Sequence, residues 1–348
     1  MNDAGGSVAG GSGGTGNAGT NQADGSAEAG SVASNETKTL IPHESWTCNM
    51  PDGIVPPQSG AFVFEADYEV GEVHDLGETQ YGHRHQIDIV GGTVNGSEIQ
   101  GDILTGGLDY QLKLSNGALE IEQINVIRTR DGALIYFRNC GTAADEASEV
   151  RMVPDFEAPN ASPYAWLNSA TIVGIREFDM ANKKLKVRFF DVSGVVPGSE
   201  TVRVTKPEGF PNQTWECKKS SGIQGAVVYT ETVRIGASLA IGASKYGTRN
   251  VIPITGGTTS GGITGEVLVG GGDYQILSPT FEIDARYTLR TNDGELIIVR
   301  NCGPLGGLIP VFETRKDGPY AWLNQGDYRS SNPSISIGAV ILTIYEAR

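Results

Sequence analysis

The chain has 348 residues, enough for two domains, and its 26 basic and 41 acidic residues give a formal net charge of −15. It contains no dense run of Lys or Arg, so we expect no nucleic-acid partner and no docking on anionic lipid, since both need clustered basic side chains. No apolar segment approaches the ~18–20 residues of a membrane-spanning helix.

Residues 1–40 form a Gly-, Ser- and Ala-rich tail, and the first aromatic residue is Trp46. Such a segment cannot bury enough apolar surface to offset its ordering entropy, which predicts a disordered linker. The tail resembles the spacer that follows the lipid-bearing cysteine of many Gram-negative lipoproteins, with Met1 where that cysteine would stand. We therefore expect an exported protein (periplasmic, anchored in the outer membrane, or extracellular) whose only membrane contact is an N-terminal lipid anchor. The alternative is a cytoplasmic protein with a flexible N-terminus.

Residues 41–195 carry short segments rich in Val, Ile, Thr and Tyr, separated by Gly-rich turns, the pattern of an all-β domain. Asp131-Gly132 is typical of a hairpin turn, because Gly accepts the positive φ that such a connection needs. The expected strands of this part are 61–70, 98–106, 118–129, 133–140, 164–178 and 184–192. A connector at 196–210 leads to a second part, 211–348.

The second part repeats the first. IRTRDGALIYFRNCG at 127–141 returns as LRTNDGELIIVRNCG at 289–303, and PYAWLN at 163–168 returns unchanged at 319–324. The interval exceeds the period of about 20–50 residues of solenoid repeats, so it indicates duplication of a whole domain. We predict two tandem antiparallel β-barrels of about seven or eight strands each, because closure removes exposed sheet edges. Duplication of a self-associating domain would let the two barrels pack as a pseudo-dimer.

Each copy has one early and one late cysteine, the late one within an Asn-Cys-Gly motif. This placement predicts the disulfides Cys48–Cys140 and Cys217–Cys302, as expected in an oxidising compartment, with four buried thiols as the alternative. No C-x-x-C spacing occurs, which disfavours a zinc site built from cysteines.

The second copy resembles family 3237 of the domains of unknown function, small β-barrel proteins largely from bacteria and fungi. The resemblance rests on an ordered series of motifs: 253–258 (PITGGT), 265–268 (GEVL), 270–275 (GGGDYQ), 284–291 (DARYTLRT) and 300–301 (RN). It implies the barrel fold and no settled activity. The first copy departs from the pattern, reading EQINV at 122–126 where the second reads DARYT.

Glu266 and Asp273 are the acid–base candidates, since both follow glycines that let the backbone approach a ligand closely. Arg249 and Arg286 are candidates to hold a carboxylate or a developing oxyanion. Ion pairing and local turn hydrogen bonds are the structural alternatives. Strand alternation places Asp284, Arg286 and Thr288 on one face, either the solvent side of a sheet or a polar barrel lumen. Further candidate ligand-binding residues are Tyr274, Asp284, Arg300, Asn301 and Trp322 in the second copy and Arg84, Asp109 and Tyr110 in the first.

His83 and His85 share one face of a strand and would chelate a metal with Asp88, Asp102 or His74 as a third ligand, but the second copy has Thr248 and Asn250 instead. Since the chain holds only four histidines and the second copy lacks this pair, we predict no metal site. We also predict no cofactor, because no phosphate-cradling or dinucleotide-binding motif opens a helix. Our leading hypothesis is a cofactor-independent isomerase, cyclase or lyase acting on a small, largely apolar, oxygenated molecule in the second barrel. The alternatives are a non-catalytic lipoprotein that binds a hydrophobic molecule, and a structural protein with filled barrels.

Overall fold

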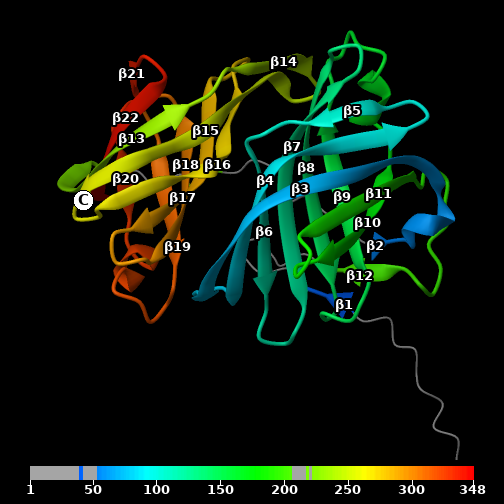
Figure 1. Ribbon diagram of the computed structural model, residues 1–348, viewed down its shortest axis with the longest axis horizontal. Coiled ribbons are helices and arrows are strands. Elements are labelled where there is room, and N and C mark those ends of the chain that lie inside the picture. Colours follow the sequence, from blue (N-terminus) through cyan, green and yellow to red (C-terminus); the bar gives the residue numbers. More distant parts are fainter. Residues whose placement is uncertain (1–38, 42–52, 206–216, 219–221) are drawn as a thin grey trace, which may run out of the picture. The chain divides into compact units, whose positions relative to one another are not determined.

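The computed structural model describes residues 39–41, 53–205, 217–218 and 222–348 (Figure 1). The tail prediction for 1–40 falls almost wholly outside these residues, as do the start of the first domain and part of the 196–210 connector. Within the connector, β12 (Val202–Val204) pairs with β1 (Thr39–Leu40) and β2 (Gly53–Ile54) in a small three-stranded sheet. None of the helices in the described ranges has the length and apolarity to span a bilayer.

The first copy forms a closed barrel, which confirms the all-β prediction for this part. Eight strands follow one another in the order β3-β11-β10-β9-β8-β7-β5-β4, and pairing of β3 with β4 closes the ring, while β6 pairs with both β4 and β7. The elements are η1 (Pro57–Ser59), β3 (Ala61–Glu78), β4 (His83–Gly96), β5 (Gln100–Ile103), β6 (Gly107–Lys113), β7 (Leu119–Thr129), β8 (Leu134–Ala143), β9 (Val150–Glu157), η2 (Ala165–Asn168), β10 (Ile172–Asp179) and β11 (Lys184–Asp191).

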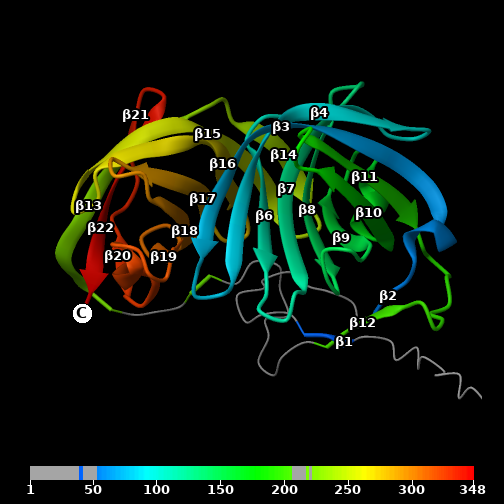
Figure 2. The same ribbon diagram turned by 60° about the horizontal axis from the view of Figure 1, so that its bottom comes forward.

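The second copy forms a nearly closed barrel along the path β19-β18-β17-β16-β15-β13-β22-β20. Figures 1 and 2 show β13 and β22 side by side, which brings the C-terminus next to the start of β13. The elements are β13 (Gln224–Ile235), β14 (Leu239–Ser244), β15 (Gly247–Gly261), β16 (Gly265–Ile276), β17 (Glu282–Thr291), β18 (Leu296–Pro304), β19 (Ile309–Thr314), η3 (Ala321–Asn324), β20 (Tyr328–Ser330), β21 (Ser334–Ser336) and β22 (Ala339–Ala347).

The repeated PYAWLN motif has a structural role in both copies. Its tyrosine hydroxyl donates to the aspartate of the Asp-Gly hairpin, from Tyr320 to Asp293 Oδ1 at 3.1 Å in the second copy. Its asparagine exchanges two hydrogen bonds with the backbone at the end of β19, between Asn324 and Thr314 at 2.9 Å. The first copy has the same contacts through Tyr164 and Asn168. The motif therefore fastens a loop to a hairpin and a strand end.

The two barrels are filled differently. The first has a cluster of phenylalanines, with the rings of Phe64 and Phe189 4.6 Å apart and those of Phe137 and Phe156 5.1 Å apart. A separate apolar cluster joins side chains of both copies, including Leu108, Tyr110, Ile124, Val251, Tyr274 and Ile298. This shared cluster buries apolar surface between the repeats.

The Cys217–Cys302 disulfide is present, as predicted. Cys140 is also disulfide-bonded, and its predicted partner Cys48 lies outside the described residues. Crosslinks of this kind are typical of exported proteins.

Candidate functional site

The second barrel contains an apolar cavity of about 250 Å³. Strand alternation explains its walls, because Ile283, Ala285 and Tyr287 of β17 point toward it from one face of that strand. Phe281, Leu305 and Ile335 also line it and remain exposed, which leaves apolar surface around the opening. The volume is slightly below the roughly 300–1,000 Å³ of clefts that hold drug-sized ligands, so the cavity suits a small molecule.

Asp273 of β16 brings a carboxyl group to this apolar cavity. Its Oδ2 accepts a hydrogen bond from Gln275 Nε2 at 2.5 Å, while its Oδ1 is buried without a hydrogen-bond partner among the described residues. Burial raises the pKa of Asp273 to about 7, and the charge of Asp284 acts in the same direction. At neutral pH the carboxyl is thus divided between its protonated and ionised forms, as acid–base chemistry requires.

The equivalent residue of the first copy, Asp109, has different neighbours. It is fully buried and forms an ion pair with Arg176 of β10 at 3.1 Å, besides a hydrogen bond from Gln111. Within the part of the chain that the structure describes, Asp273 has no ion pair. Duplication thus left one carboxyl neutralised by an arginine and the other facing an apolar cavity.

A second buried acid lies behind the cavity wall. Tyr287, which lines the cavity, donates its hydroxyl hydrogen bond to Glu231 Oε1 at 2.5 Å. Glu231 is only 1% exposed, and burial raises its pKa to about 7. Glu231 was not among the candidates predicted from the sequence, although alternation in β13 places it on the same side as the buried Tyr229 and Val233.

The predicted arginine clamp lies outside this cavity, in contacts between the copies. Arg249 is fully buried, and its guanidinium forms two hydrogen bonds of 3.0 and 3.1 Å from Nε to the carboxylate of Glu157 in the first copy. Arg286 pairs with Asp284 at 2.9 Å and also with Glu122 of the first copy. Both arginines are therefore held by carboxylates.

These contacts are reciprocal. Arg249 and Arg84 occupy equivalent positions, as do Glu157 and Glu313, and Arg84 pairs with Glu313 at 2.8 Å. Two more equivalent pairs of contacts are reciprocal. Ser244 Oγ donates to Glu157 at 2.5 Å, and its counterpart Thr79 Oγ1 donates to Glu313 at 2.6 Å. The backbone N–H of Asn160 donates to the carbonyl of Ala243, and that of Lys316 donates to the carbonyl of Glu78, both at 2.8 Å.

The charged face of β17 is thus neither a solvent face nor a barrel lumen. Arg286 reaches Glu122, and Thr288 donates to Gln86, so this face meets the first copy. Such an outcome is hard to infer from alternation alone, because alternation gives two faces without saying what covers each.

The remaining predicted residues divide between the cavity and the rest of the fold. Asn301 lines the cavity and donates from Nδ2 to Ser330 Oγ at 3.1 Å. Glu266 does not line it; the side chain is exposed and lies 3.4 Å from Arg290. Trp322 is 46% exposed and packs on Tyr328.

The other aromatic and basic candidates do not line the cavity. Tyr274 is buried in the shared apolar cluster and donates its hydroxyl hydrogen bond to the Gly106 carbonyl at 3.0 Å, and Tyr110 lies in the same cluster. Arg300 pairs with Asp284 at 2.9 Å. The structure therefore brings Asp273 and Asn301 together with Gln275 at the cavity and leaves the other candidates in packing or ion pairs.

Known proteins resemble this chain over part of its length. A relative from Bradyrhizobium diazoefficiens, a UPF0311 protein, is 37% identical over 93 residues, which are 26% of this chain and 61% of the relative. The chain thus spans about three fifths of the length of this curated relative.

Solved structures also match part of the chain. A conserved protein of unknown function from Rhodopseudomonas palustris is 27% identical with a TM-score of 0.35, covering 41% of this chain and 99% of its own. A β-barrel-like protein from Acinetobacter baumannii is 26% identical with a TM-score of 0.33, covering 38% of this chain and 94% of its own.

The profile of the family described as "Protein of unknown function (DUF3237)" matches residues 59–192 and 224–309, which are more than half of the chain. The two matched segments fall on the two barrels described above. The predicted resemblance is confirmed: the chain belongs to the DUF3237 family of proteins of unknown function, as a tandem duplication of its domain.

Proposed function

We propose that the second barrel binds a small, largely apolar molecule carrying a carbonyl group and catalyses a cofactor-independent isomerisation by proton transfer through Asp273. The observation that carries this proposal is a carboxyl group with a pKa of about 7 at an apolar cavity, without the arginine that neutralises its counterpart Asp109. A general base works best when its pKa lies near the working pH.

The proposed step conserves atoms and electrons. The Asp273 carboxylate removes a proton from the carbon next to the substrate carbonyl, and the electron pair of that C–H bond moves to the carbonyl oxygen as an enolate. In a β,γ-unsaturated substrate, the protonated Asp273 then returns the proton at the γ carbon, which restores the carbonyl and moves the carbon–carbon double bond into conjugation with it.

The enolate oxygen needs a hydrogen-bond donor at this site. Arg249 and Arg286, the donors expected from the sequence, are engaged by carboxylates. Side-chain amides at the cavity are better placed, because Gln275 and Asn301 both line it and each amide nitrogen carries two N–H bonds. We assign the oxyanion contact to these amides.

Proton transfer is tested with a panel of small β,γ-unsaturated ketones in D₂O, followed by NMR for conversion to the conjugated isomer and for deuterium incorporation. We expect Asp273→Asn to lower turnover by at least 100-fold while binding of the ketone is retained, since only the proton acceptor is lost. Glu266→Gln, which changes an exposed side chain, is expected to retain turnover. Equal turnover in wild type and Asp273→Asn would overturn the proposal.

A second candidate function, binding without catalysis, is favoured by the apolar character of the cavity wall. Native mass spectrometry of the purified protein, followed by denaturing extraction of co-purified molecules, separates the two. A bound molecule that neither exchanges hydrogen with D₂O nor isomerises in the protein indicates a binding module. Export belongs to the same proposal and is supported by the Cys217–Cys302 disulfide, while the N-terminal lipid anchor stays a prediction.

We also infer that the two copies pack as a pseudo-dimer. The reciprocal pairs Arg84–Glu313 and Arg249–Glu157 support this arrangement, because an interface with two-fold symmetry uses the same patch on both partners.

A further inference from the structure

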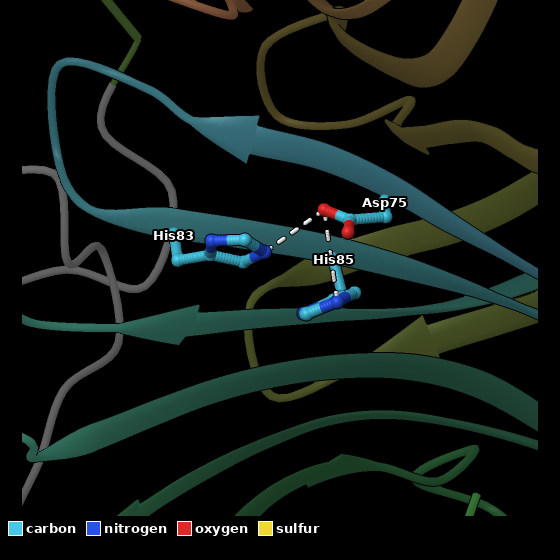
Figure 3. A group of neighbouring side chains, drawn as sticks. All are labelled: Asp75, His83 and His85. Carbon is cyan, nitrogen blue, oxygen red and sulfur yellow. Dashed lines mark hydrogen bonds and ion pairs between the residues drawn. The ribbon is translucent and has the colours of Figure 1, made fainter.

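The first copy gathers three potential metal-ligating side chains, Asp75, His83 and His85, on its β3–β4 hairpin (Figure 3). None of them lines the cavity of the second barrel. His83 and His85 lie two residues apart on β4, so their imidazoles share one face of the strand. Asp75 lies on β3 directly opposite His85 in the antiparallel register. Figure 3 shows the three side chains pointing toward one another across the two strands.

The ligand atoms are close enough to share one ion. Asp75 Oδ1 lies 2.9 Å from His83 Nε2 and 3.7 Å from His85 Nε2, and one ligand atom from each of the three residues lies within 4.8 Å of the others. A tetrahedral ion held at about 2.0–2.1 Å needs ligand atoms roughly 3.3 Å apart. Only small side-chain rotations separate the observed spacing from that geometry.

Neighbouring groups hold two of the ligands in place. Asp75 Oδ1 accepts a hydrogen bond from the Gly77 backbone N–H at 2.7 Å. Glu78 Oε1 lies 3.4 Å from Nδ1 of His83, on the far side of the ring from the nitrogen that faces Asp75. An ion bound between Nε2 and Asp75 would displace the proton of their 2.9 Å hydrogen bond, and Glu78 would then hold the remaining proton on Nδ1 of His83.

We propose that Asp75, His83 and His85 bind a divalent transition-metal ion such as Zn²⁺ or Ni²⁺. Two imidazoles and one carboxylate are a donor set that these ions accept, and Ca²⁺ or Mg²⁺ would prefer oxygen ligands throughout. Three protein ligands leave a further coordination position for water or a small ligand. The two histidines also line a surface cleft of about 1,000 Å³, together with Glu78, Glu146, Lys113 and Lys316.

From the sequence alone, Asp88, Asp102 and His74 are the candidate third ligands beside these histidines, and no metal site is predicted. Of those, His74 is hydrogen-bonded to Asp88 at 3.0 Å, and Asp102 is exposed on β5. Asp75 was missed because it lies eight residues from His83, and only the hairpin register brings the two together. The second copy has Thr248 and Asn250 in place of the histidines and Ala240 opposite Asn250, so it carries no matching donor set.

Isothermal titration of chelator-treated full-length protein with ZnCl₂ tests the site, and Co²⁺ absorption reports the coordination. We expect one ion per chain in the wild type, and at least a tenfold loss of affinity in His83→Gln, His85→Gln and Asp75→Asn. Asp102→Asn serves as the control with unchanged affinity. Melting temperatures of the metal-free variants verify the fold.

Two results would overturn the site. One is the absence of saturable Zn²⁺ binding to wild-type protein at about 100 μM metal, a concentration well above the dissociation constants of structural zinc sites. The other is binding that persists unchanged in His83→Gln and His85→Gln together. Loss of affinity in Asp102→Asn equal to that in Asp75→Asn would likewise refute the assignment of the third ligand.

Discussion

Replacing Glu231 by Gln tests the electrostatic description of the second barrel. The carboxyl of Glu231 is buried beside Tyr287, and its pKa is raised from 4.5 to about 7 in the folded protein. Between pH 4.5 and about pH 7 the folded state binds more protons than the unfolded chain, so the free energy of unfolding falls as the pH rises. At 1.36 kcal/mol per pH unit the loss amounts to about 3 kcal/mol at pH 8 relative to pH 4.

Glu231→Gln cannot ionise and therefore lacks this loss. Any change in packing or hydrogen bonding caused by the amide is independent of pH, so the informative quantity is the difference between variant and wild type at each pH. We expect that difference to shift by about 3 kcal/mol in favour of the variant between pH 4 and pH 8. Other titrating groups cancel because both proteins contain them.

Urea unfolding at five pH values, with the slope m fitted at each, supplies the measurement. Glu266→Gln provides a control for removing one carboxylate from the protein surface, since its side chain is exposed. Parallel stability curves for wild type and Glu231→Gln would refute the reasoning and show that this carboxyl ionises without penalty in the fold.

Three further predictions follow from the contacts described above. Arg249→Met leaves the Glu157 carboxylate buried without its partner, so we expect a loss of about 3–5 kcal/mol in unfolding free energy, largely recovered when Glu157→Gln is added in a double-mutant cycle. Ala285→Leu fills part of the cavity and should weaken binding of an apolar fluorescent probe by at least tenfold; unchanged probe binding would place the ligand elsewhere. Cys217→Ser opens the crosslink to Cys302 and should cost about 2–5 kcal/mol in urea unfolding, with a loss at least as large in reduced wild type, which also loses the disulfide of Cys140.

The sequence predicted the duplication and the barrel class well, because both depend on local patterns that repeat. Alternating apolar residues and Asp-Gly turns define strands and hairpins without reference to the rest of the chain. The disulfide of the second copy was predictable for the same reason, since Cys217 and Cys302 hold positions that the first copy duplicates.

The site was only partly predictable. Asp273 was identified from its glycine-rich setting, but the roles of Arg249 and Trp322 depend on what lies opposite them in three dimensions. Arg249 meets a glutamate that is 92 residues away in the sequence, and the tryptophan belongs to a motif that secures a hairpin. Glu231 needed knowledge of which face of β13 is buried, and Asp75 needed the hairpin register.

The reciprocal contacts between the copies have an evolutionary consequence. In a dimer of identical chains, any substitution appears on both sides of the axis, so a residue useful in one half must be tolerated in the other. Here one chain carries both halves, and each position can change alone: Glu231 stands where the first copy has Ala66, and Tyr287 stands where it has Asn125. The covalent link also fixes the two halves at equal numbers, and dilution that dissociates separate chains cannot part them. One half is thereby free to keep a phenylalanine-rich core while the other maintains an apolar cavity beside its own core.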